Sequence, residues 1–285
     1  MLNRFKSVVY LQGGLGNQLF QYSYFLYLIK DNNQANIDIG RLLYDKQHNN
    51  ISVIDFFKLG LDEYQVSENK SLVYLIRDSF LSKFFRFTRR FFNIKNTLCS
   101  HYDYDAMSNL SSLGMRKRNY VGYFQFVDSA LFCKSNLEGR LEEIYSSKID
   151  LYKSKYEGKM GLHIRRGDFV LSKDPKHDCV SLDYIKKAIN GVGDNVIVFS
   201  DDILWCKENL SEYSSLEFHS GENAFDDFLA LSQCSNYILS GSTFSWWAAF
   251  LFSSADTKIT FPKEQKSQFL SKRSNEKVGW KYSAL

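Results

Sequence analysis

The chain has 285 residues, a length that suits one large domain or two small ones. Apolar residues make up 44% of it and charged residues 24%, which is typical of a soluble globular protein. The net charge of +4 is milder than nucleic-acid-binding domains usually carry, so we expect no nucleic-acid partner.

The five cysteines are far apart, and none shows a CxxC or Cys/His zinc-ligand spacing. This usage predicts reduced thiols and a cytoplasmic protein. The longest apolar run, WWAAFLF, is far below the roughly 18 residues of a membrane-spanning helix. The N-terminal run VVYL is also too short for a signal peptide.

The first forty residues are expected to fold as strand, turn, helix and strand, over Val8–Leu11, Gly13–Gly16, Asn17–Ile29 and Ala35–Ile39. The turn GGLGNQLFQY resembles a dinucleotide-binding fingerprint, with Gly14 and Gly16 in place and Asp38 near the end of the next strand. Leu19 stands where the third glycine belongs, so a plain strand-to-helix turn fits equally well.

Residues 40–150 are harder to interpret, and segment 77–95 (RDSFLSKFFRFTRRFFNIK) has the most unusual composition. As a helix it would place phenylalanines on one face and lysine and arginines on the other. That pattern predicts weak peripheral contact with an anionic membrane, at the inner face of a bacterial membrane. The alternative is a helix that packs its phenylalanines into the N-terminal domain.

Strands and helices alternate clearly from about residue 159. The expected strands are Met160–Ile164, Val196–Ser200, Leu216–His219, Tyr237–Leu239 and Lys258–Phe261; the expected helices are Leu182–Ile189, Ile203–Asn209, Ala224–Gln233 and Ser245–Phe252. This alternation predicts a parallel α/β sheet. Together with the first unit it predicts two Rossmann-like domains facing a cleft, 1–150 and 151–285, with a boundary in the polar stretch 146–158.

The motif HIRRGD follows the strand that ends at Ile164, and ligands of open α/β sheets bind beyond such strand ends. The side chains of Arg165 and Arg166 are suited to clamping a diphosphate, because a guanidinium matches phosphate oxygens in pairs. The alternative is a surface ion-pair site in which Asp168 holds one arginine.

The motif GSTFSWW lies between a strand and a helix and offers backbone N–H groups to an anion. Its turn comprises Ser242, Thr243, Phe244 and Ser245, and the alternative role of its hydroxyls is to cap the helix. At the head of the preceding helix, the Asp227 carboxylate is suited to accepting the paired N–H donors of guanine. An ordinary acidic first turn is the alternative.

Four motifs together resemble one family: GGLGNQLFQY, HIRRGD, FSDD and GSTFSWWAAF occur in the order found in the bacterial α-1,2-fucosyltransferases, glycosyltransferase family 11. The resemblance covers residues 8–262. It implies a GT-B architecture, GDP-fucose as donor, inversion at the anomeric carbon and no metal or other cofactor. The implied acceptor is the 2-hydroxyl of a terminal β-galactose on an oligosaccharide such as an O-antigen, including lipid-linked forms.

The resemblance also assigns roles to residues. Arg165 would contact the diphosphate as the essential arginine, His163 would lie by the guanine, and Asp227 would bind the guanine edge. Arg166, Asp168 and the turn Ser242–Ser245 would complete the donor site. We expect Asn17, with Gln18 beside Gly14 and Gly16, to orient fucose or acceptor, and the general base stays unassigned.

Three other functions are open on the sequence alone. Asp103-Tyr104-Asp105 spells the DxD pattern of metal-dependent, GT-A-type transferases. The glycine turn with Asp38 would suit an NAD-dependent oxidoreductase. A carbohydrate- or RNA-binding module would use the many aromatic residues but leaves HIRRGD and STFSWW unexplained.

Overall fold

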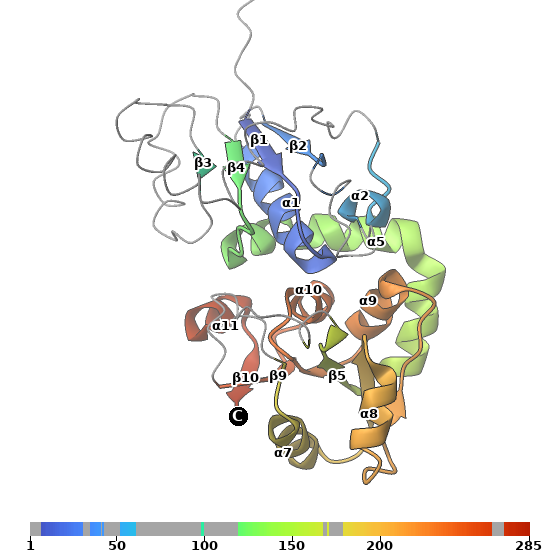
Figure 1. Ribbon diagram of the computed structural model, residues 1–285. Coiled ribbons are helices and arrows are strands. Elements are labelled where there is room, and N and C mark those ends of the chain that lie inside the picture. Colours follow the sequence, from blue (N-terminus) through green and yellow to red (C-terminus); the bar gives the residue numbers. More distant parts are fainter. Residues whose placement is uncertain are drawn as a thin grey trace, which may run out of the picture.

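The protein is described by a computed structural model, which covers residues 7–30, 35–40, 42, 52–60, 98–99, 119–167, 170, 179–263 and 271–285. Two parallel sheets, each accompanied by helices, form two halves of the molecule (Figure 1). This arrangement confirms the expected α/β architecture of GT-B type with two Rossmann-like units.

The N-terminal sheet has the strand order β2-β1-β4-β3, with all pairs parallel. Its strands are β1 (Ser7–Tyr10), β2 (Ala35–Asp38), β3 (Leu98–Cys99) and β4 (Asn119–Val121). The glycine turn leads from β1 into α1 (Leu15–Ile29), and the short helix α2 (Val53–Phe56) follows β2. Gly13 adopts a φ of +77°, a left-handed conformation that glycine reaches without strain.

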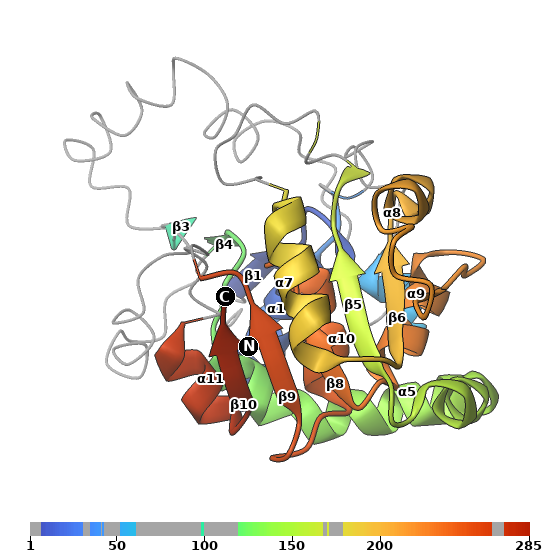
Figure 2. The ribbon, with the colours of Figure 1, turned by 90° about the horizontal axis from the view of Figure 1, so that it is seen from below.

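The C-terminal sheet has the order β10-β9-β8-β5-β6-β7, again all parallel (Figure 2). Its strands are β5 (Met160–Ile164), β6 (Val196–Ser200), β7 (Glu217–Phe218), β8 (Asn236–Ile238), β9 (Lys258–Phe261) and β10 (Lys281–Ala284). The helices are α7 (Leu182–Val192), α8 (Ile203–Asn209), α9 (Ala224–Ser232), α10 (Thr243–Leu251) and α11 (Lys272–Val278). Helices α9 and α10 lie between this sheet and the N-terminal half (Figure 1).

The long helix α5 (Val127–Tyr156) runs along both halves and packs against α1 and α9. The expected boundary at 146–158 therefore lies in the last turns of this helix and not in a loop. Tyr145 interrupts it with a φ of −126° and a ψ of 22°. The last helix, α11, lies against α5, where Lys277 Nζ is 2.5 Å from Asp128 Oδ1.

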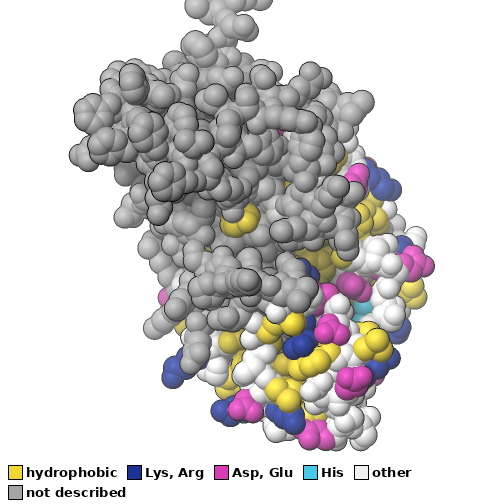
Figure 3. Space-filling model, in the orientation of Figure 1, with side chains coloured by type: hydrophobic (Ala, Val, Ile, Leu, Met, Phe, Trp, Pro, Cys, Tyr) yellow, Lys and Arg dark blue, Asp and Glu magenta, His cyan; other side chains and the backbone are white. Residues whose placement is uncertain are grey.

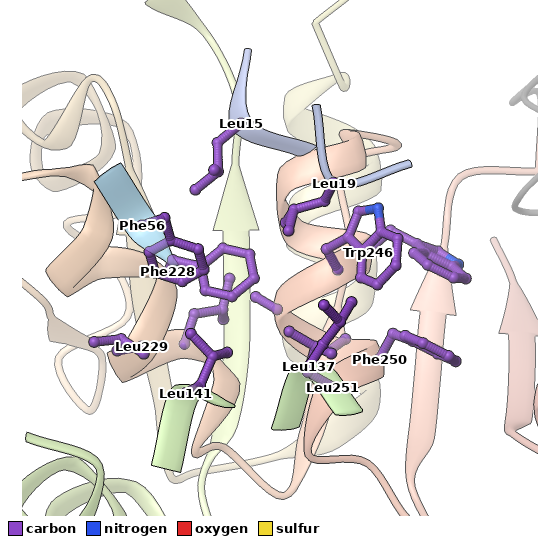
Figure 4. Close-up of a cluster of buried hydrophobic side chains, with 14 of the residues drawn as sticks. Leu15, Leu19, Phe56, Leu137, Leu141, Phe228, Leu229, Trp246, Phe250 and Leu251 are labelled. Atoms are coloured by element: carbon purple, nitrogen blue, oxygen red, sulfur yellow. The ribbon is translucent and has the colours of Figure 1, made fainter. Parts of the chain in front are cut away.

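One hydrophobic core joins the two halves (Figure 4). Phe20 of α1 stacks on Trp246 of α10 with ring centroids 5.0 Å apart, and Phe56 of α2 meets Phe228 of α9 at 5.1 Å. All four side chains are fully buried. Such aromatic pairs add about 0.5–1.5 kcal/mol each beyond their buried area, so the halves are held in a defined relative position.

Acidic, basic and apolar side chains are interspersed over the described part of the face drawn in Figure 3. Within the described ranges, none of the helices has both the length and the apolar character needed to cross a bilayer.

Candidate functional site

The C-terminal sheet reverses its strand order between β5 and β8. From β5 the chain proceeds outward through β6 and β7, whereas β8, β9 and β10 follow on the other side. The segments after β5 and β8 therefore diverge at the carboxyl edge of the sheet, which is where open α/β sheets bind ligands. His163 Nδ1 lies 3.0 Å from Ser240 Oγ, and its ring is 5.5 Å from that of Phe244. The structure thus brings HIRRGD and GSTFSWW together.

Arg165 follows β5 and forms an ion pair with Asp201, the residue directly after β6. Its Nη1 lies 2.7 Å from Asp201 Oδ2, while Oδ1 of the same carboxylate accepts the backbone N–H of Arg166 at 2.8 Å. A Cβ on Gly167 would lie 2.5 Å from Asp201 Oδ2, so a larger residue there would displace the carboxylate from this ion pair. The acid found on Arg165 is Asp201; Asp168, the predicted alternative, lies outside the described residues.

Arg166 is directed toward α8. Its guanidinium carbon lies 3.6 Å from the centre of the Trp205 ring, and its Nε donates to Asp202 Oδ2 at 3.1 Å. Asp202 in turn caps α8 by accepting the N–H of Trp205. These contacts hold Arg166 in one place beside the site, and its predicted contact with a diphosphate stays a prediction.

His163 is buried at the carboxyl end of β5. Loss of hydration, the largest cause, and the nearby charge of Arg165 lower the pKa of its imidazole to about 3, against the opposing effect of the Asp227 carboxylate. The ring is therefore neutral at physiological pH. The same electrostatic effects place Arg165 and Asp227 close to His163.

Two adjacent acids at the start of α9 have different environments. Asn223 caps the helix by accepting the N–H groups of Phe225 and Asp226. Asp226 is buried and forms an ion pair with Lys148 of α5. The Asp227 side chain keeps 36% of its surface exposed, so Asp227 is the acid of the pair that a ligand can reach.

The turn before α10 uses its serine side chains for the helix itself. Ser242 Oγ accepts the N–H of Phe244 at 3.2 Å, and the buried Ser245 donates to the Ser242 carbonyl at 3.1 Å. The capping role considered for this turn is therefore present. What the turn offers an anion is the positive end of α10 and its backbone N–H groups.

Helix α1 begins against the same turn. A Cβ on Gly16 would lie 2.4 Å from the backbone nitrogen of Phe244 and 2.4 Å from the carbonyl carbon of Thr243. The N-terminal turns of α1 and α10 are thus in backbone contact, which only a glycine at position 16 permits. Two positive helix ends therefore meet here, and the ring of His163 lies 5.5 Å from that of Phe244 in the first turn of α10.

The side chains of Asn17 and Gln18, which the sequence suggested would orient the substrate, make hydrogen bonds within the protein around the glycine turn. Gln18 is fully buried; its Nε2 donates to the Gly13 carbonyl at 2.7 Å and its Oε1 accepts the Val53 N–H at 2.9 Å. Gln18 therefore fixes the turn from inside the N-terminal half. Gly14 is the N-cap of α1, and Asn17 Oδ1 accepts from Gln125 at 3.1 Å. The catalytic role expected for Asn17 stays a prediction.

Asp38 and the DxD tripeptide were the features that favoured an oxidoreductase and a metal-dependent transferase. Asp38 is buried and its Oδ1 accepts the N–H of Gly40 at 2.8 Å, so it stabilises the turn after β2. The DxD tripeptide 103–105 lies outside the described residues. Within the part of the chain that is described, no three His, Cys, Asp or Glu side chains are grouped so as to hold a metal ion.

The fold is an α/β architecture with two parallel sheets, and the candidate site lies where the strand order of the C-terminal sheet reverses. The sequence profile of Glycosyl transferase family 11 matches residues 7–284, and the chain belongs to this family. This result confirms the resemblance seen in the four motifs.

Three curated relatives indicate what similar proteins do. The O-antigen biosynthesis glycosyltransferase WbnK of Escherichia coli is 27% identical over 89% of this chain and 93% of its own length. An alpha-1,2-colitosyltransferase of Escherichia coli is 26% identical over 86% of this chain and 87% of its own. The galactoside 2-alpha-L-fucosyltransferase SEC1 of Bos taurus is 31% identical, over 32% of this chain and 28% of its own.

Sequence reasoning missed several residues around the site. Asp201 and Asp202 were recognised as part of FSDD, but their pairing with Arg165 and Arg166 was not. Trp205 carries no sequence signal beyond its place in the first turn of α8. His219, beside Asp227, and Tyr156, at the end of α5, belong to no recognised motif.

Proposed function

We propose that this protein is an inverting galactoside α-1,2-fucosyltransferase. It transfers L-fucose from GDP-fucose to the 2-hydroxyl of a terminal β-galactose on an oligosaccharide, such as an O-antigen. The motif resemblance, the family membership and the activities named for the bovine and bacterial relatives support this assignment.

The observation that carries the proposal is the position of Arg165. The Asp201 carboxylate holds its guanidinium beyond β5 and close to His163, whose ring lies 5.5 Å from that of Phe244 in the first turn of α10. One permanent cation and two positive helix ends suit the diphosphate of a nucleotide sugar. Negative charge grows on GDP as the bond to fucose breaks, and a preorganised donor aimed at such charge is worth about 3 kcal/mol.

The remaining site residues fit the nucleoside part of the donor. The partly exposed Asp227 carboxylate is an acceptor for the N1–H and amino groups of guanine. His163 stays neutral and buried next to it, so it would contact the nucleoside without adding charge. In this assignment residues 151–285 bind the donor and residues 1–150 bind the acceptor.

We propose that the reaction needs no metal ion, since Arg165 would neutralise the leaving diphosphate. The DxD tripeptide 103–105 is the feature that would argue otherwise. Activity that EDTA abolishes and manganese restores would contradict the proposal.

Colitose is a second candidate for the transferred sugar, because a colitosyltransferase aligns with most of this chain. Colitose is fucose without the 3-hydroxyl group, so both donors would present the same GDP to Arg165 and Asp227. The two candidates differ at the sugar alone.

A donor panel tests the proposed function. Purified protein would be given GDP-fucose, GDP-colitose, GDP-mannose or UDP-galactose together with a set of β-galactosides, and release of the nucleoside diphosphate would be measured with and without EDTA. We expect release from GDP-fucose that depends on a β-galactoside and survives EDTA. Faster turnover of GDP-colitose would transfer the assignment to the second candidate.

We also propose that the enzyme acts in the cytoplasm, with weak contact to anionic membranes through residues 77–95. That segment lies outside the described residues, so the proposal depends on its aromatic and cationic faces in the sequence. Failure of the protein to sediment with anionic liposomes at low salt would contradict it.

A further inference from the structure

His219 lies just beyond β7, at the edge of the C-terminal sheet, and no recognised motif includes it. Its side chain is more than nine-tenths buried. Nδ1 lies 2.8 Å from the Tyr156 hydroxyl, and Nε2 lies 3.3 Å from Asp227 Oδ1. Among the described residues Nε2 has no hydrogen bond, since its approach to Asp227 is close enough for an ion pair but not aligned for a hydrogen bond.

The chemistry of the three groups fixes which atom carries the proton in each contact. An ionised carboxylate only accepts, so the His219 nitrogen that faces Asp227 must carry a proton. In the neutral ring Nδ1 is then an acceptor, and the Tyr156 hydroxyl donates to it. Tyr156, the last residue of α5, therefore selects the tautomer of His219 that points an N–H toward Asp227.

Packing holds this arrangement in place. The His219 ring lies against Phe199 with centroids 4.8 Å apart and meets the edge of Tyr156 at 5.6 Å. Gly221 closes the other side: a Cβ there would lie 2.3 Å from Asp227 Oδ1 and 3.2 Å from His219 Nε2. Asp227 is thus confined between a fixed imidazole and a glycine backbone.

We propose that His219, oriented by Tyr156, is a positioning residue that sets the Asp227 carboxylate for the base of the donor nucleotide. The proposal rests on the proposed function, in which Asp227 accepts both N–H donors of guanine. A carboxylate that accepts two parallel hydrogen bonds needs a defined orientation. A single hydrogen bond can still form when the carboxylate is rotated. His219 would therefore determine the preference for a base with two adjacent donors.

Calorimetry with GDP and IDP on the full-length protein tests this. Hypoxanthine in IDP keeps N1–H but lacks the amino group, so the ratio of the two dissociation constants reports the second hydrogen bond. We expect the wild type to prefer GDP by about tenfold, the usual effect of a hydrogen bond to a charged group. His219→Leu and Tyr156→Phe should reduce this ratio to about two- or threefold, mainly by weakening GDP binding.

Two variants provide the controls. His219→Gln keeps an N–H donor at similar reach and should restore most of the preference. Ser220→Ala alters the exposed neighbour of His219 and should leave the ratio unchanged. Tyr156→Phe conserves volume, so it gives the answer even if the Leu variant does not fold.

Asp227→Asn separates this inference from the proposed function. If both the inference and the proposed function hold, Asp227→Asn abolishes the preference and adding His219→Leu reduces it no further, because both act through one carboxylate. If Asp227→Asn abolishes the preference but the His219 and Tyr156 variants keep it, the positioning role is wrong and the proposed function stands. If Asp227→Asn leaves GDP binding unchanged, the assigned role of Asp227 fails as well.

Discussion

At the residue scale, the two arginines of HIRRGD have different surroundings. Asp201 holds Arg165 beyond the end of β5, whereas Trp205 and Asp202 hold Arg166 against α8. Arg165→Ala should lower kcat by about a hundredfold or more, because the leaving diphosphate would lose a preorganised cation. Arg165→Lys should rescue poorly, since an ammonium cannot reproduce a guanidinium that contacts two oxygens at once.

Steady-state rates with GDP-fucose measure the effect, and circular dichroism confirms that each variant is folded. Lys186→Ala is a suitable control, because it removes a surface cation from α7 that pairs with Glu212. An Arg165→Lys variant near the wild-type rate would contradict the clamp role.

His163 should make folding sensitive to acid. Its pKa is about 3 in the folded protein against an ordinary value of 6.5, so between these values the unfolded chain binds the extra proton. Stability contributed by the neutral ring is complete above pH 6.5 and is lost as the pH falls toward 3, by up to about 1.4 kcal/mol per pH unit.

Urea unfolding at pH 7 and pH 5 measures this effect. Other carboxyl groups also titrate, so the comparison is with His163→Asn, which removes the titrating ring. The wild type should lose about 2 kcal/mol more than the variant between the two values. Equal losses in the two proteins would show that the ring is hydrated or already charged.

The sequence predicted which residues lie together at this site, but it did not predict the orientation and contacts of their side chains. His163, Arg165 and the Ser242–Ser245 turn converge because strand ends of a parallel sheet share one edge. The turning of Arg166 toward Trp205, and the contact of His219 with Asp227, depend on side chains that meet only in the fold. No periodicity or motif encodes such pairings.

At the element scale, the contact between the first turns of α1 and α10 requires Gly16. Gly16→Ala would bring a methyl group within 2.4 Å of backbone atoms of Thr243 and Phe244, so one helix would have to shift. Such overpacking typically costs about 1–3 kcal/mol, and a shifted helix end should also lower the rate with GDP-fucose.

Gly139→Ala is the matched control, since a Cβ there in α5 meets no atom within 4 Å. That variant should gain about 0.4–1 kcal/mol from the reduced entropy of the unfolded chain. Thermal unfolding of both variants checks the pair. A Gly16→Ala protein as stable and active as the wild type would contradict the close helix contact.

Elements of the C-terminal half were predictable where short apolar runs alternate with helical patterns. Strands β5, β6 and β9 and helix α8 have the predicted bounds. By contrast, α5 was not recognised as one long helix, because its polar second half resembles a boundary segment. Its length follows from packing against α1 and α9, which involves contacts far apart in sequence.

At the scale of the whole molecule, the shared core determines how the two halves cooperate. Phe20 and Phe56 from the N-terminal half pack on Trp246 and Phe228 from the other. The same packing sets α1 against α10 at the ligand site, so the geometry that would bind the diphosphate depends on both sheets. The geometry of the proposed donor site would therefore depend on both halves, although the residues proposed to contact the donor belong to 151–285.

The measurement that tests the central claim most directly is the structure of the reaction product. The purified enzyme would be incubated with GDP-fucose and a β-galactoside, and the product's linkage and anomeric configuration would be determined by NMR. GDP-fucose carries a β-linked sugar, so inverting transfer predicts an α-fucosyl residue on the galactose 2-hydroxyl. A β-fucosyl product, a linkage to another hydroxyl, or no transfer to any β-galactoside would contradict the assignment.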